Sequence, residues 1–258
     1  MAQTVGGTLW VVGLGMTLGS HLTPIARSAI EQSDMLFVAA SHALVEQWVL
    51  GMNPNSRSLE PLYRAHPTRA QTYRTMQAVV MAEVRSGKTV CASFYGHPGV
   101  FAAVPHRLIA QARDEGFAAH MEPGISAEAC LYADLGIDPG QYGCVQHEAT
   151  RWLMAERAVD PQALLLLWQV GQAGDFDGLR TPSSRAQRQL LVDKLLRFYP
   201  SAHGVILYEA AVLPTHRHRA SLTPLAALAD CDFDAHVTLV VPPLEVDWCT
   251  SSAPESGR

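Results

Sequence analysis

The chain has 258 residues, of which 48% are hydrophobic and 17% are charged. This balance is ordinary for a folded protein and excludes disorder over most of the chain, and the length permits one large domain or two modest ones. The formal net charge of −5, from 19 basic and 24 acidic residues, disfavours a surface that follows nucleic-acid phosphates. The longest apolar run, Ala163–Trp168, is too short to span a bilayer.

The five cysteines are odd in number, scattered, and form no C-x-x-C pair. A disulfide framework or a zinc site is therefore disfavoured, and we expect no metal centre. The amino terminus has no basic stretch followed by a long apolar run, so no secretory signal is predicted. A reducing cytoplasm fits this cysteine usage.

Apolar runs of strand length alternate with helical segments in the first half. The predicted strands are Thr8–Val12, Met35–Ala39, Thr89–Tyr95 and Ala118–Met121. The predicted helices begin at Pro24, cover Ser41–Leu50, run from Pro67 to Ser86, and cover Val104–Glu115. Such alternation predicts a parallel α/β domain with right-handed crossovers.

After Pro123 the alternation is looser, so we predict a domain boundary near Met121–Gly124. This gives an N-terminal domain of residues 1–122, a C-terminal domain of 123–249 and a disordered tail of 250–258. The elements predicted for the second domain are helix Ala127–Asp134, strand Leu164–Val170, helix Ser184–Tyr199, strand Val205–Glu209, short helix Pro224–Ala229 and strand Val237–Val241.

Two of the predicted strands end in glycine-rich turns. Thr89–Tyr95 runs into Gly96–Gly99, and Ala118–Met121 runs into Pro123-Gly124, after which Ser126 caps a helix. The carboxyl ends of parallel strands meet at one edge of the sheet, where open α/β sheets bind ligands. Glycine lets a planar ligand lie against the backbone, whose free N–H and C=O groups then bind its polar edge. The sequence therefore predicts a ligand site at this edge.

A dinucleotide-binding fingerprint is the alternative for the first turn, Gly13-Leu14-Gly15. The third glycine, Gly19, follows the second by four residues rather than three, and no carboxylate closes the second strand, which ends in Ala39-Ala40-Ser41. A nicotinamide cofactor is therefore disfavoured. A tight strand-to-helix turn without ligand contact stays open for this segment.

The segments YGHPGVF (Tyr95–Phe101) and PGISAEACLYADLGIDP (Pro123–Pro139) resemble motifs of the tetrapyrrole-methylase superfamily. The resemblance is nearest to the borosin peptide backbone α-N-methyltransferases, which share His97 where the superfamily usually has an acidic residue. It runs from about Gly7 to about Leu244. It implies a two-domain α/β fold of the tetrapyrrole-methylase type, with a parallel N-terminal sheet, a mixed C-terminal sheet and a cofactor cleft between them. It also implies S-adenosylmethionine (SAM) as cofactor, S-adenosylhomocysteine as product, and a homodimer.

The resemblance also implies a set of cofactor contacts, chiefly from the two glycine turns. They are Tyr95, Gly96, His97, Val100, Phe101, Ser126, Ala127, Gln169, Val170 and Thr223. From the residues alone, Gln169 at the exit of a very apolar strand can offer one acceptor and two donors to a ligand. Turns that merely join sheet to helix, and a buried strand capped by a polar residue, are the alternatives.

Arg69 and Tyr73 lie four residues apart on the helix predicted after Pro67, so they share one face, and Tyr63 lies just upstream. From sequence alone such a pair is ordinarily surface packing. The resemblance implies that these three residues and Tyr95 are catalytic.

The chemistry of amide methylation explains why such residues are needed. An amide nitrogen is a poor nucleophile because its lone pair is delocalised into the carbonyl, and loss of its proton gives an imidate whose charge falls mostly on oxygen. Tyr73, with an ordinary pKa of about 10, is too weak a base alone, and a nearby Arg69 guanidinium would favour its phenolate. We predict Tyr73 as base or proton relay, Arg69 as its activator, and Tyr63 or Tyr95 as donors to the developing oxyanion.

The run His216–Arg219 places two histidines on one side of an extended segment but supplies no third ligand, so a solvated, mixed-charge segment is predicted rather than a metal site. The following Arg219–Leu225 resembles a helix start of the superfamily, which implies that Thr223 lines the adenine side of the cleft.

We therefore predict a cytoplasmic SAM-dependent enzyme that N-methylates backbone amides of a separate, ribosomally made precursor peptide, with no nucleic-acid or membrane partner. Fungal relatives carry their substrate as a C-terminal extension, whereas the tail Thr250–Arg258 has no Val/Ile/Gly-rich core peptide, which favours the split arrangement. Three alternatives stay open: a methyltransferase of tetrapyrrole or corrin intermediates, a ribosomal-RNA ribose methyltransferase, and a non-catalytic SAM-dependent peptide-binding module. The acidic balance disfavours the second.

Overall fold

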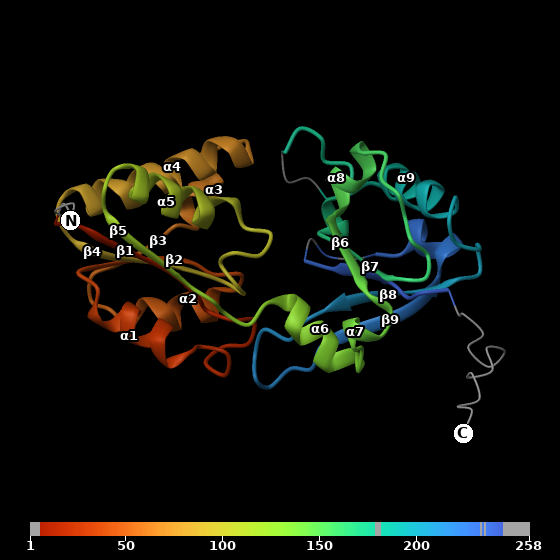
Figure 1. Ribbon diagram of the computed structural model, residues 1–258, viewed down its shortest axis with the longest axis horizontal. Helices are drawn as coiled ribbons and strands as arrows, with labels where there is room; N and C mark the ends of the chain where they lie inside the picture. The colour runs from red at the N-terminus through yellow and green to blue at the C-terminus, as the bar shows by residue number, and fades with distance from the viewer. Residues whose placement is uncertain (1–5, 179–181, 233, 235, 245–258) are drawn as a thin grey trace, which may run out of the picture. The chain divides into compact units, whose positions relative to one another are not determined.

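The structure is a computed structural model that describes residues 6–178, 182–232, 234 and 236–244 (Figure 1). Within these residues the chain packs as two compact units. The first comprises 6–137, 175–178 and 209–219, and the second comprises 138–174, 182–208, 220–232, 234 and 236–244. The helix after Pro123 thus packs with the first unit. A division into domains at residues 122 and 123 stays a prediction, and the predicted tail 250–258 lies outside the described residues.

One parallel sheet forms the centre of the first unit, and the predicted parallel N-terminal sheet is confirmed. Its strands are β1 (Thr8–Gly13), β2 (Met35–Ala39), β3 (Ser56–Ser58), β4 (Thr89–Phe94) and β5 (Ala118–Glu122). They lie in the order β3-β2-β4-β1-β5, and every pairing is parallel. Gly13 of β1 pairs with Phe94 of β4, so these two strands end level with each other.

Helices cover both faces of this sheet. The helices of this unit are α1 (Pro24–Gln32), α2 (Ala43–Leu50), α3 (Pro61–Ala65), α4 (Arg69–Arg85), α5 (Ala103–Asp114) and α6 (Ala127–Leu135). α1 and α2 lie on one face, and α3, α4 and α5 lie on the other (Figure 1). Leu9 and Val11 pack in the core beneath α4 and α5, whereas Val12 packs in the core beneath α1 and α2. Burial on both faces explains why the central strands are continuous apolar runs.

Two short elements of the first unit escape prediction from sequence. β3 consists of three polar residues, and α3 is five residues long. Both are too short to show a recognisable hydrophobic periodicity. The start of the long helix also differs from the prediction, because Pro67 does not open it. Thr68 is the N-cap, its Oγ1 accepting the N–H of Gln71 at 3.4 Å, and the helix begins at Arg69.

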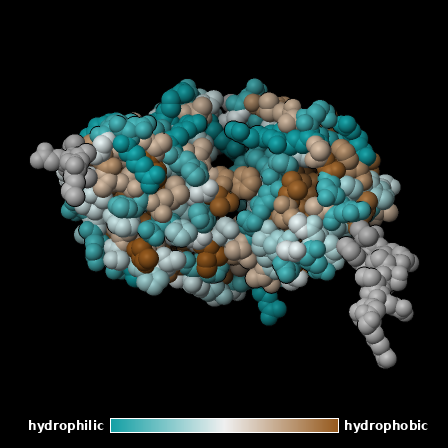
Figure 2. Space-filling model, viewed as in Figure 1, coloured by the Kyte–Doolittle hydropathy of each residue, from teal (hydrophilic) through white to brown (hydrophobic). Residues whose placement is uncertain are grey.

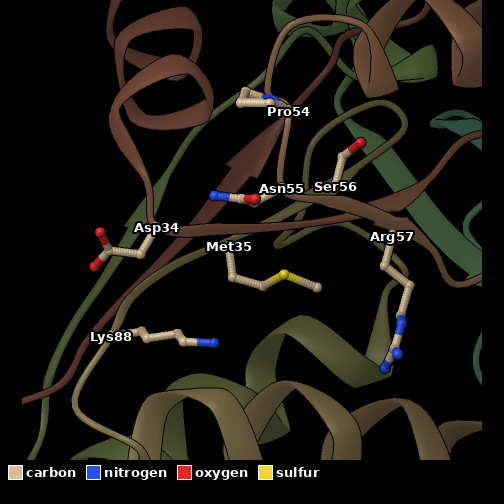
Figure 3. A pocket seen from close by; sticks show the side chains of 7 residues that line it. All are labelled: Asp34, Met35, Pro54, Asn55, Ser56, Arg57 and Lys88. Carbon is tan, nitrogen blue, oxygen red and sulfur yellow. The ribbon is translucent and has the colours of Figure 1, made fainter.

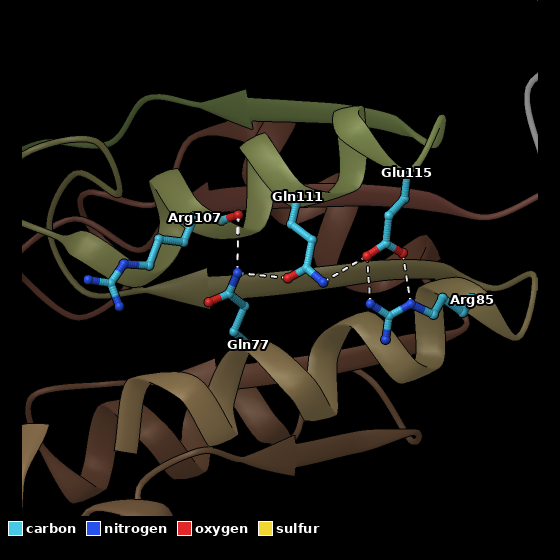
Figure 4. Close-up of polar contacts among 5 residues, drawn as sticks. All are labelled: Gln77, Arg85, Arg107, Gln111 and Glu115. Carbon is cyan, nitrogen blue, oxygen red and sulfur yellow. Dashed lines mark hydrogen bonds and ion pairs between the residues drawn. The ribbon is translucent and has the colours of Figure 1, made fainter. Parts of the chain in front are cut away.

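A polar network on the surface joins α4 to α5 (Figure 4). Arg85 donates through Nε and Nη2 to the two carboxylate oxygens of Glu115, at 2.7 and 2.6 Å. Gln111 donates to Glu115 at 2.7 Å, and Gln77 donates to Gln111 at 2.7 Å. The hydrogen bonds from Arg85 and Gln111 lower the pKa of Glu115 to about 2. The network fixes the carboxyl-terminal half of the helix that carries Arg69 and Tyr73 at its other end.

A mixed sheet forms the centre of the second unit, as predicted. Its strands are β6 (Cys144–Glu148), β7 (Leu164–Trp168), β8 (Gly204–Glu209), β9 (Arg219–Pro224) and β10 (Thr238–Val241), in the order β6-β7-β10-β8-β9. β6 and β7 are parallel, whereas β10 is antiparallel to both β7 and β8. The described helical segments are α7 (Pro139–Tyr142), α8 (Ala149–Met154), α9 (Arg185–Leu195) and two 3₁₀ helices, η1 (Val170–Gln172) and η2 (Leu225–Asp230).

Several features of the second unit differ from the sequence-based prediction. β6, α7 and α8 were not predicted, and the strand predicted to reach Val170 ends at Trp168. The segment predicted as helix Pro224–Ala229 is the end of β9 followed by η2. Thr223 therefore lies on a strand. The core of this unit is confirmed where the apolar runs are longest, because β7 is buried at all five positions.

The surface has no broad apolar band on the face that Figure 2 shows, where hydrophobic residues are dispersed among hydrophilic ones. Single exposed apolar side chains are normal for a folded protein. Within the described residues, we find no helix with the length and hydropathy that crossing a membrane requires.

Lys194 is a buried cation in the second unit, only 9% exposed. Its Nζ donates to the main-chain carbonyls of Trp152 and Ala155, both at 2.6 Å, and lies 4.7 Å from the Trp152 ring centroid. These carbonyls end α8, where a helix leaves acceptors unpaired and carries partial negative charge. Lys194 of α9 therefore fixes the end of α8.

We expect Lys194→Met to lower the free energy of unfolding by about 2 kcal/mol, because the buried carbonyls lose a charged donor. Chemical denaturation of the variant and the parent chain measures the difference. Arg197→Ala is the control, since Arg197 is exposed and forms a surface ion pair with Glu156; a change within about 0.5 kcal/mol is expected there. Equal losses in the two variants would contradict this role for Lys194.

Candidate functional site

Three turns meet without side chains at the carboxyl ends of β1, β4 and β5. A Cβ built on Gly13 would lie 2.6 Å from the carbonyl oxygen of Gly96 and 2.7 Å from the Cα of Gly124. A Cβ on Gly124 would lie 2.4 Å from the same Gly96 oxygen. All three distances are shorter than a real Cβ atom tolerates, so the turns pack backbone against backbone. The sequence predicted glycine turns after β4 and β5, and the structure brings them together.

The first loop pairs with the turn after β4. The N–H of Gly15 donates to Gly96 O at 3.1 Å, and the N–H of Gly96 donates to Gly15 O at 2.8 Å. Both glycines have positive φ, 71° and 66°, which a residue with a side chain adopts only at a cost. The segment left open as a plain strand-to-helix turn is therefore part of the glycine-packed edge.

His21 holds the first loop closed from within. Its Nδ1 accepts the N–H groups of Met16 at 3.3 Å and Thr17 at 3.2 Å. The loop is fixed further by the 209–219 segment, because Thr17 Oγ1 donates to Ala211 O at 2.8 Å. Burial lowers the pKa of His21, and the negative charge of Asp134 opposes part of that effect. A neutral imidazole is the form that the two accepted hydrogen bonds require.

The turn from Gly96 to Phe101 is held in shape by two histidines. The N–H of Gly99 donates to His97 Nδ1 at 2.9 Å, and His106 Nε2 donates to the Gly99 carbonyl at 2.9 Å. Phe101 has a positive φ of 50° and is 47% exposed. An exposed aromatic ring on strained backbone is typical of a ligand contact rather than of a simple connection.

Ser126 caps α6 as predicted, its Oγ accepting the N–H of Ala129 at 3.1 Å. The other N–H groups of the first helical turn, including that of Ala127, have no partner within the helix. Ser126 and Ala127 are only partly buried. This end of α6 therefore presents backbone donors next to the glycine-packed edge, because Gly124 precedes its N-cap by two residues.

Tyrosines from three elements gather in the first unit. The rings of Tyr63 on α3 and Tyr73 on α4 lie edge to face, with centroids 6.5 Å apart, and the two hydroxyls are hydrogen-bonded. Burial raises the pKa of Tyr63, and the phenols of Tyr73 and Tyr95 raise it further. The hydrogen bond to Tyr73 also raises the pKa of Tyr63. It therefore favours the protonated Tyr63 hydroxyl, which is the form that donates to the Tyr73 oxygen.

Tyr95 directly follows β4 and completes this tyrosine cluster. It is 42% exposed, yet loss of solvent around its hydroxyl is the main cause that raises its pKa. The Tyr73 phenol also raises the pKa of Tyr95, whereas the Arg69 guanidinium lowers it. The four residues predicted as catalytic are thus neighbours in the fold.

One charged residue of the cluster was missed from sequence. Glu60, the N-cap position of α3, raises the pKa of both Tyr63 and Tyr95 through its negative charge. No motif signals it, because Glu60 and Tyr95 lie far apart in sequence and interact only in the folded unit. The charged groups identified beside the three phenols, within the described residues, are therefore Arg69 and Glu60.

The predicted contacts on the second unit stay predictions. Gln169 has a positive φ of 59° at the N-cap of η1 and is partly buried. Val170 is fully buried in the core of that unit, so Gln169 is the side chain of this strand end that can meet a ligand. Thr223 is partly buried on β9.

Among the residues the structure describes, no group of three or more histidine, cysteine, aspartate or glutamate side chains could hold a metal ion. Of the His216–Arg219 run, His218 lies with its Nδ1 3.3 Å from Asp134 Oδ1, and Arg219 pairs with Glu209. These contacts are those of a surface segment of mixed charge.

A cavity of about 650 Å³ lies at the opposite edge of the first sheet, beside the start of β2 and the residue before β4 (Figure 3). Two of its charged groups already have protein partners: Lys88 Nζ lies 2.6 Å from Glu83, and Asp34 accepts the N–H of Thr89 at 2.8 Å. The cavity lies at the amino ends of β2 and β4, whereas the glycine turns follow the carboxyl ends of β1, β4 and β5. It offers no group that the chemistry above needs.

Comparison with known proteins relates this geometry to one family. The family model described as Tetrapyrrole (Corrin/Porphyrin) Methylases matches residues 8–226. The chain is similar to the methyltransferase/ribosomally synthesized cyclic peptide gymnopeptides precursor of Gymnopus fusipes, with 38% identity over 95% of this chain and 59% of that protein. It is 40% identical to the type I borosin cyclic peptide precursor of Coprinopsis marcescibilis, over 83% of this chain and 55% of that protein. It is 39% identical to the omphalotin A precursor of Omphalotus olearius, over 82% of this chain and 51% of that protein. The chain thus spans little more than half the length of these relatives.

Solved structures agree on the fold. Uroporphyrin-III-C-methyltransferase from Thermus thermophilus matches with a TM-score of 0.67 at 19% identity, over 92% of this chain and 93% of that one. The structure of that enzyme complexed with S-adenosylhomocysteine matches with a TM-score of 0.66 at 15% identity, over 92% and 97%. Cobalt precorrin-4 methyltransferase matches with a TM-score of 0.62 at 13% identity, over 91% of this chain and 94% of that one. At these identities the likeness concerns the fold alone, and the predicted fold is confirmed.

We expect Gly124→Ala to disrupt the glycine-packed edge, because its Cβ would overlap the Gly96 carbonyl. The free energy of unfolding should fall by about 2 kcal/mol or more. Gly51→Ala is the matched control, since Gly51 has an ordinary φ of −70° and a Cβ there meets atoms at 3.5 Å. Thermal denaturation compares them, and a Gly124→Ala chain as stable as Gly51→Ala would refute the tight packing.

The closed first loop should make stability fall with acid. The pKa of His21 is lower in the folded chain than its unfolded value of about 6.5, so the unfolded chain takes up the proton first. The contribution of His21 is complete above about pH 6.5 and is lost as pH falls toward the folded pKa. His147 in the second unit, whose pKa burial also lowers, adds a slope of the same sign.

We therefore expect His21→Gln to flatten the rise in unfolding free energy between about pH 5 and pH 7 without abolishing it. Urea denaturation at several pH values measures this slope. His42→Gln, a change at the exposed cap of α2, serves as the control. An unchanged slope in His21→Gln would show that the imidazole does not hold the loop.

Proposed function

The chain belongs to the tetrapyrrole methylase family, and from that premise we propose that it transfers the methyl group of SAM to backbone amides of a peptide. The observation that carries this proposal is the tyrosine cluster with Arg69, which joins the glycine-packed edge through Tyr95 and Gly96, neighbours in the chain. One feature supplies a surface for the cofactor and the other supplies proton-transfer groups. The product is S-adenosylhomocysteine.

We assign SAM to the turn after β4 and the start of α6. Gly96 and its neighbouring glycines leave room for a ligand to approach the backbone, and the exposed, strained Phe101 offers a ring to it. The backbone of His97 and Val100, together with Ser126 and Ala127 at the α6 terminus, supplies further polar contacts. SAM bound here supplies an electrophilic methyl group on a positively charged sulfur.

The tyrosine cluster is suited to removing an amide proton. Tyr73 accepts a hydrogen bond from Tyr63, which stabilises negative charge on the Tyr73 oxygen. Tyr73 is therefore the proposed base or proton relay, and Arg69 is its proposed activator. Tyr63 and Tyr95 have raised pKa values, so they stay protonated and can donate to the amide oxygen as charge develops on it.

The peptide substrate is proposed from the relatives. Their names describe methyltransferases together with ribosomally synthesized cyclic peptide precursors. We propose that the chain acts on a separate precursor peptide, as a homodimer. A methyltransferase of tetrapyrrole intermediates is the alternative that the test below separates.

The test incubates the chain with SAM and the peptide encoded beside its gene and follows intact mass, with fragment spectra to locate each methyl group. We expect increments on backbone amides, and a loss of about a hundredfold or more in rate for Tyr73→Phe. Tyr142→Phe removes the hydroxyl of an exposed tyrosine on α7 and should leave the rate unchanged.

Two outcomes would count against the proposal. Full methylation by Tyr73→Phe would remove the catalytic assignment and leave the reaction standing. An unmodified peptide, combined with methylation of a porphyrinogen or corrinoid offered in its place, would overturn the peptide substrate.

A further inference from the structure

The 209–219 segment joins two strands of the second unit but packs with the first unit. It runs from the end of β8 to the start of β9, and its residues group with the first unit. Its two ends are tied to each other, because Arg219 Nε donates to Glu209 Oε2 at 3.0 Å. The segment is therefore a closed loop that contacts the first unit through the residues between its ends.

Two consecutive carbonyls of this segment hold two consecutive residues of the first loop. Ala211 O accepts the hydroxyl of Thr17 at 2.8 Å, and Val212 O accepts the N–H of Leu18 at 2.9 Å. The side chains of Val212 and Leu18 both pack against the core beneath α1 and α2. The contact thus combines two hydrogen bonds with shared apolar packing.

The later part of the segment reaches α6, where His218 Nδ1 lies 3.3 Å from Asp134 Oδ1. Both structures that the segment contacts border the glycine-packed edge. The first loop does so through Gly15, which pairs with Gly96, and α6 does so because its N-cap follows Gly124 by two residues. The segment therefore ties together two parts of that edge.

The first loop also covers part of the proposed cofactor surface. Met16 places its sulfur 3.4 Å from the point where a Cβ built on Gly96 would lie. A shift of the loop would therefore move the Met16 side chain relative to the turn to which we assign SAM. When only a fraction of the molecules hold a binding surface in place, the apparent affinity for the ligand falls in proportion to that fraction.

We propose that Thr17 is a positioning residue for the cofactor: its hydrogen bond to the 209–219 segment keeps the first loop in the cofactor-binding position. The inference rests on the proposed binding of SAM at the glycine-packed edge. It gives Thr17 no part in methyl transfer, and it makes cofactor affinity depend on a segment that joins two strands of the other unit.

Calorimetric binding of S-adenosylhomocysteine, without peptide, tests this directly. Thr17→Val keeps the shape of the side chain and removes the hydroxyl, so it should weaken binding by about fivefold, the effect of one hydrogen bond. Thr17→Ser keeps the hydroxyl and should bind within about twofold of the parent chain.

Ser56→Ala is the matched control. It removes another hydroxyl that donates to a main-chain carbonyl, that of Leu50 at 2.9 Å, but on β3 at the far side of the sheet. We expect its affinity for S-adenosylhomocysteine to be unchanged, even where its stability falls as much as that of Thr17→Val.

Amide hydrogen exchange without ligand checks that the loop is released. The Leu18 amide should exchange faster in Thr17→Val than in the parent chain, because its acceptor, Val212 O, lies on the loosened segment. Thr17→Ser and Ser56→Ala should leave that exchange rate unchanged.

The outcomes separate this role from the proposed function. If S-adenosylhomocysteine does not bind the parent chain, the proposed function fails first. If it binds, three results would overturn the role of Thr17 while cofactor binding stands: parent-like affinity in Thr17→Val, equal weakening in Thr17→Ser, or equal weakening in Ser56→Ala. An unchanged Leu18 exchange rate in Thr17→Val would overturn it as well.

Discussion

The mutual contact of Gly13, Gly96 and Gly124 is the constraint on which the rest of the first unit depends. Three parallel strands end at one level, and the turns that follow them pack closely enough that no Cβ fits between them. This contact pairs the first loop with the turn after β4 and sets where α6 begins. It leaves a sheet edge whose backbone polar groups are presented by turns rather than covered by side chains, which is what a bulky polar ligand needs.

The chemistry lies beside this edge because β4 has two roles. The residues that follow it bring Gly96 into the glycine contact and Tyr95 into the tyrosine cluster, so the proposed cofactor surface and the proposed proton-transfer groups adjoin one strand. Burial raises the pKa of both Tyr63 and Tyr95, and the charges of Glu60 and Arg69 act on Tyr95 with opposite signs. Such an arrangement needs little reorganisation when charge moves, which is the usual source of electrostatic catalysis.

The sequence was most informative where local chemistry decides structure. The apolar run Thr89–Phe94 predicts the strand, and the glycines that follow it predict the turn at the sheet edge. Ser126 is a typical N-cap residue, and it is found at the start of α6. The grouping of Tyr63, Tyr73 and Arg69 came only through the family resemblance, since their spacing alone is compatible with an ordinary surface.

What could not be predicted depends on tertiary packing. α3 is too short to show periodicity, and Glu60 approaches Tyr95 only after that helix packs against the sheet. The sequence predicts a helix starting at Pro224, because proline is common at the first helical position. In the structure Pro224 is instead the last residue of β9, a strand that lies beside β8 in the sheet. In both cases partners distant in sequence decide the local structure.

The central claim, that the glycine-packed edge of the first unit binds the cofactor, is tested most directly by amide hydrogen exchange with and without S-adenosylhomocysteine. The account predicts slower exchange across residues 96–101 and 126–129 on addition of the ligand, with no change at Asp34, Arg57 and Lys88, which line the cavity at the other edge. Protection confined to that cavity, with residues 96–101 unchanged, would contradict it.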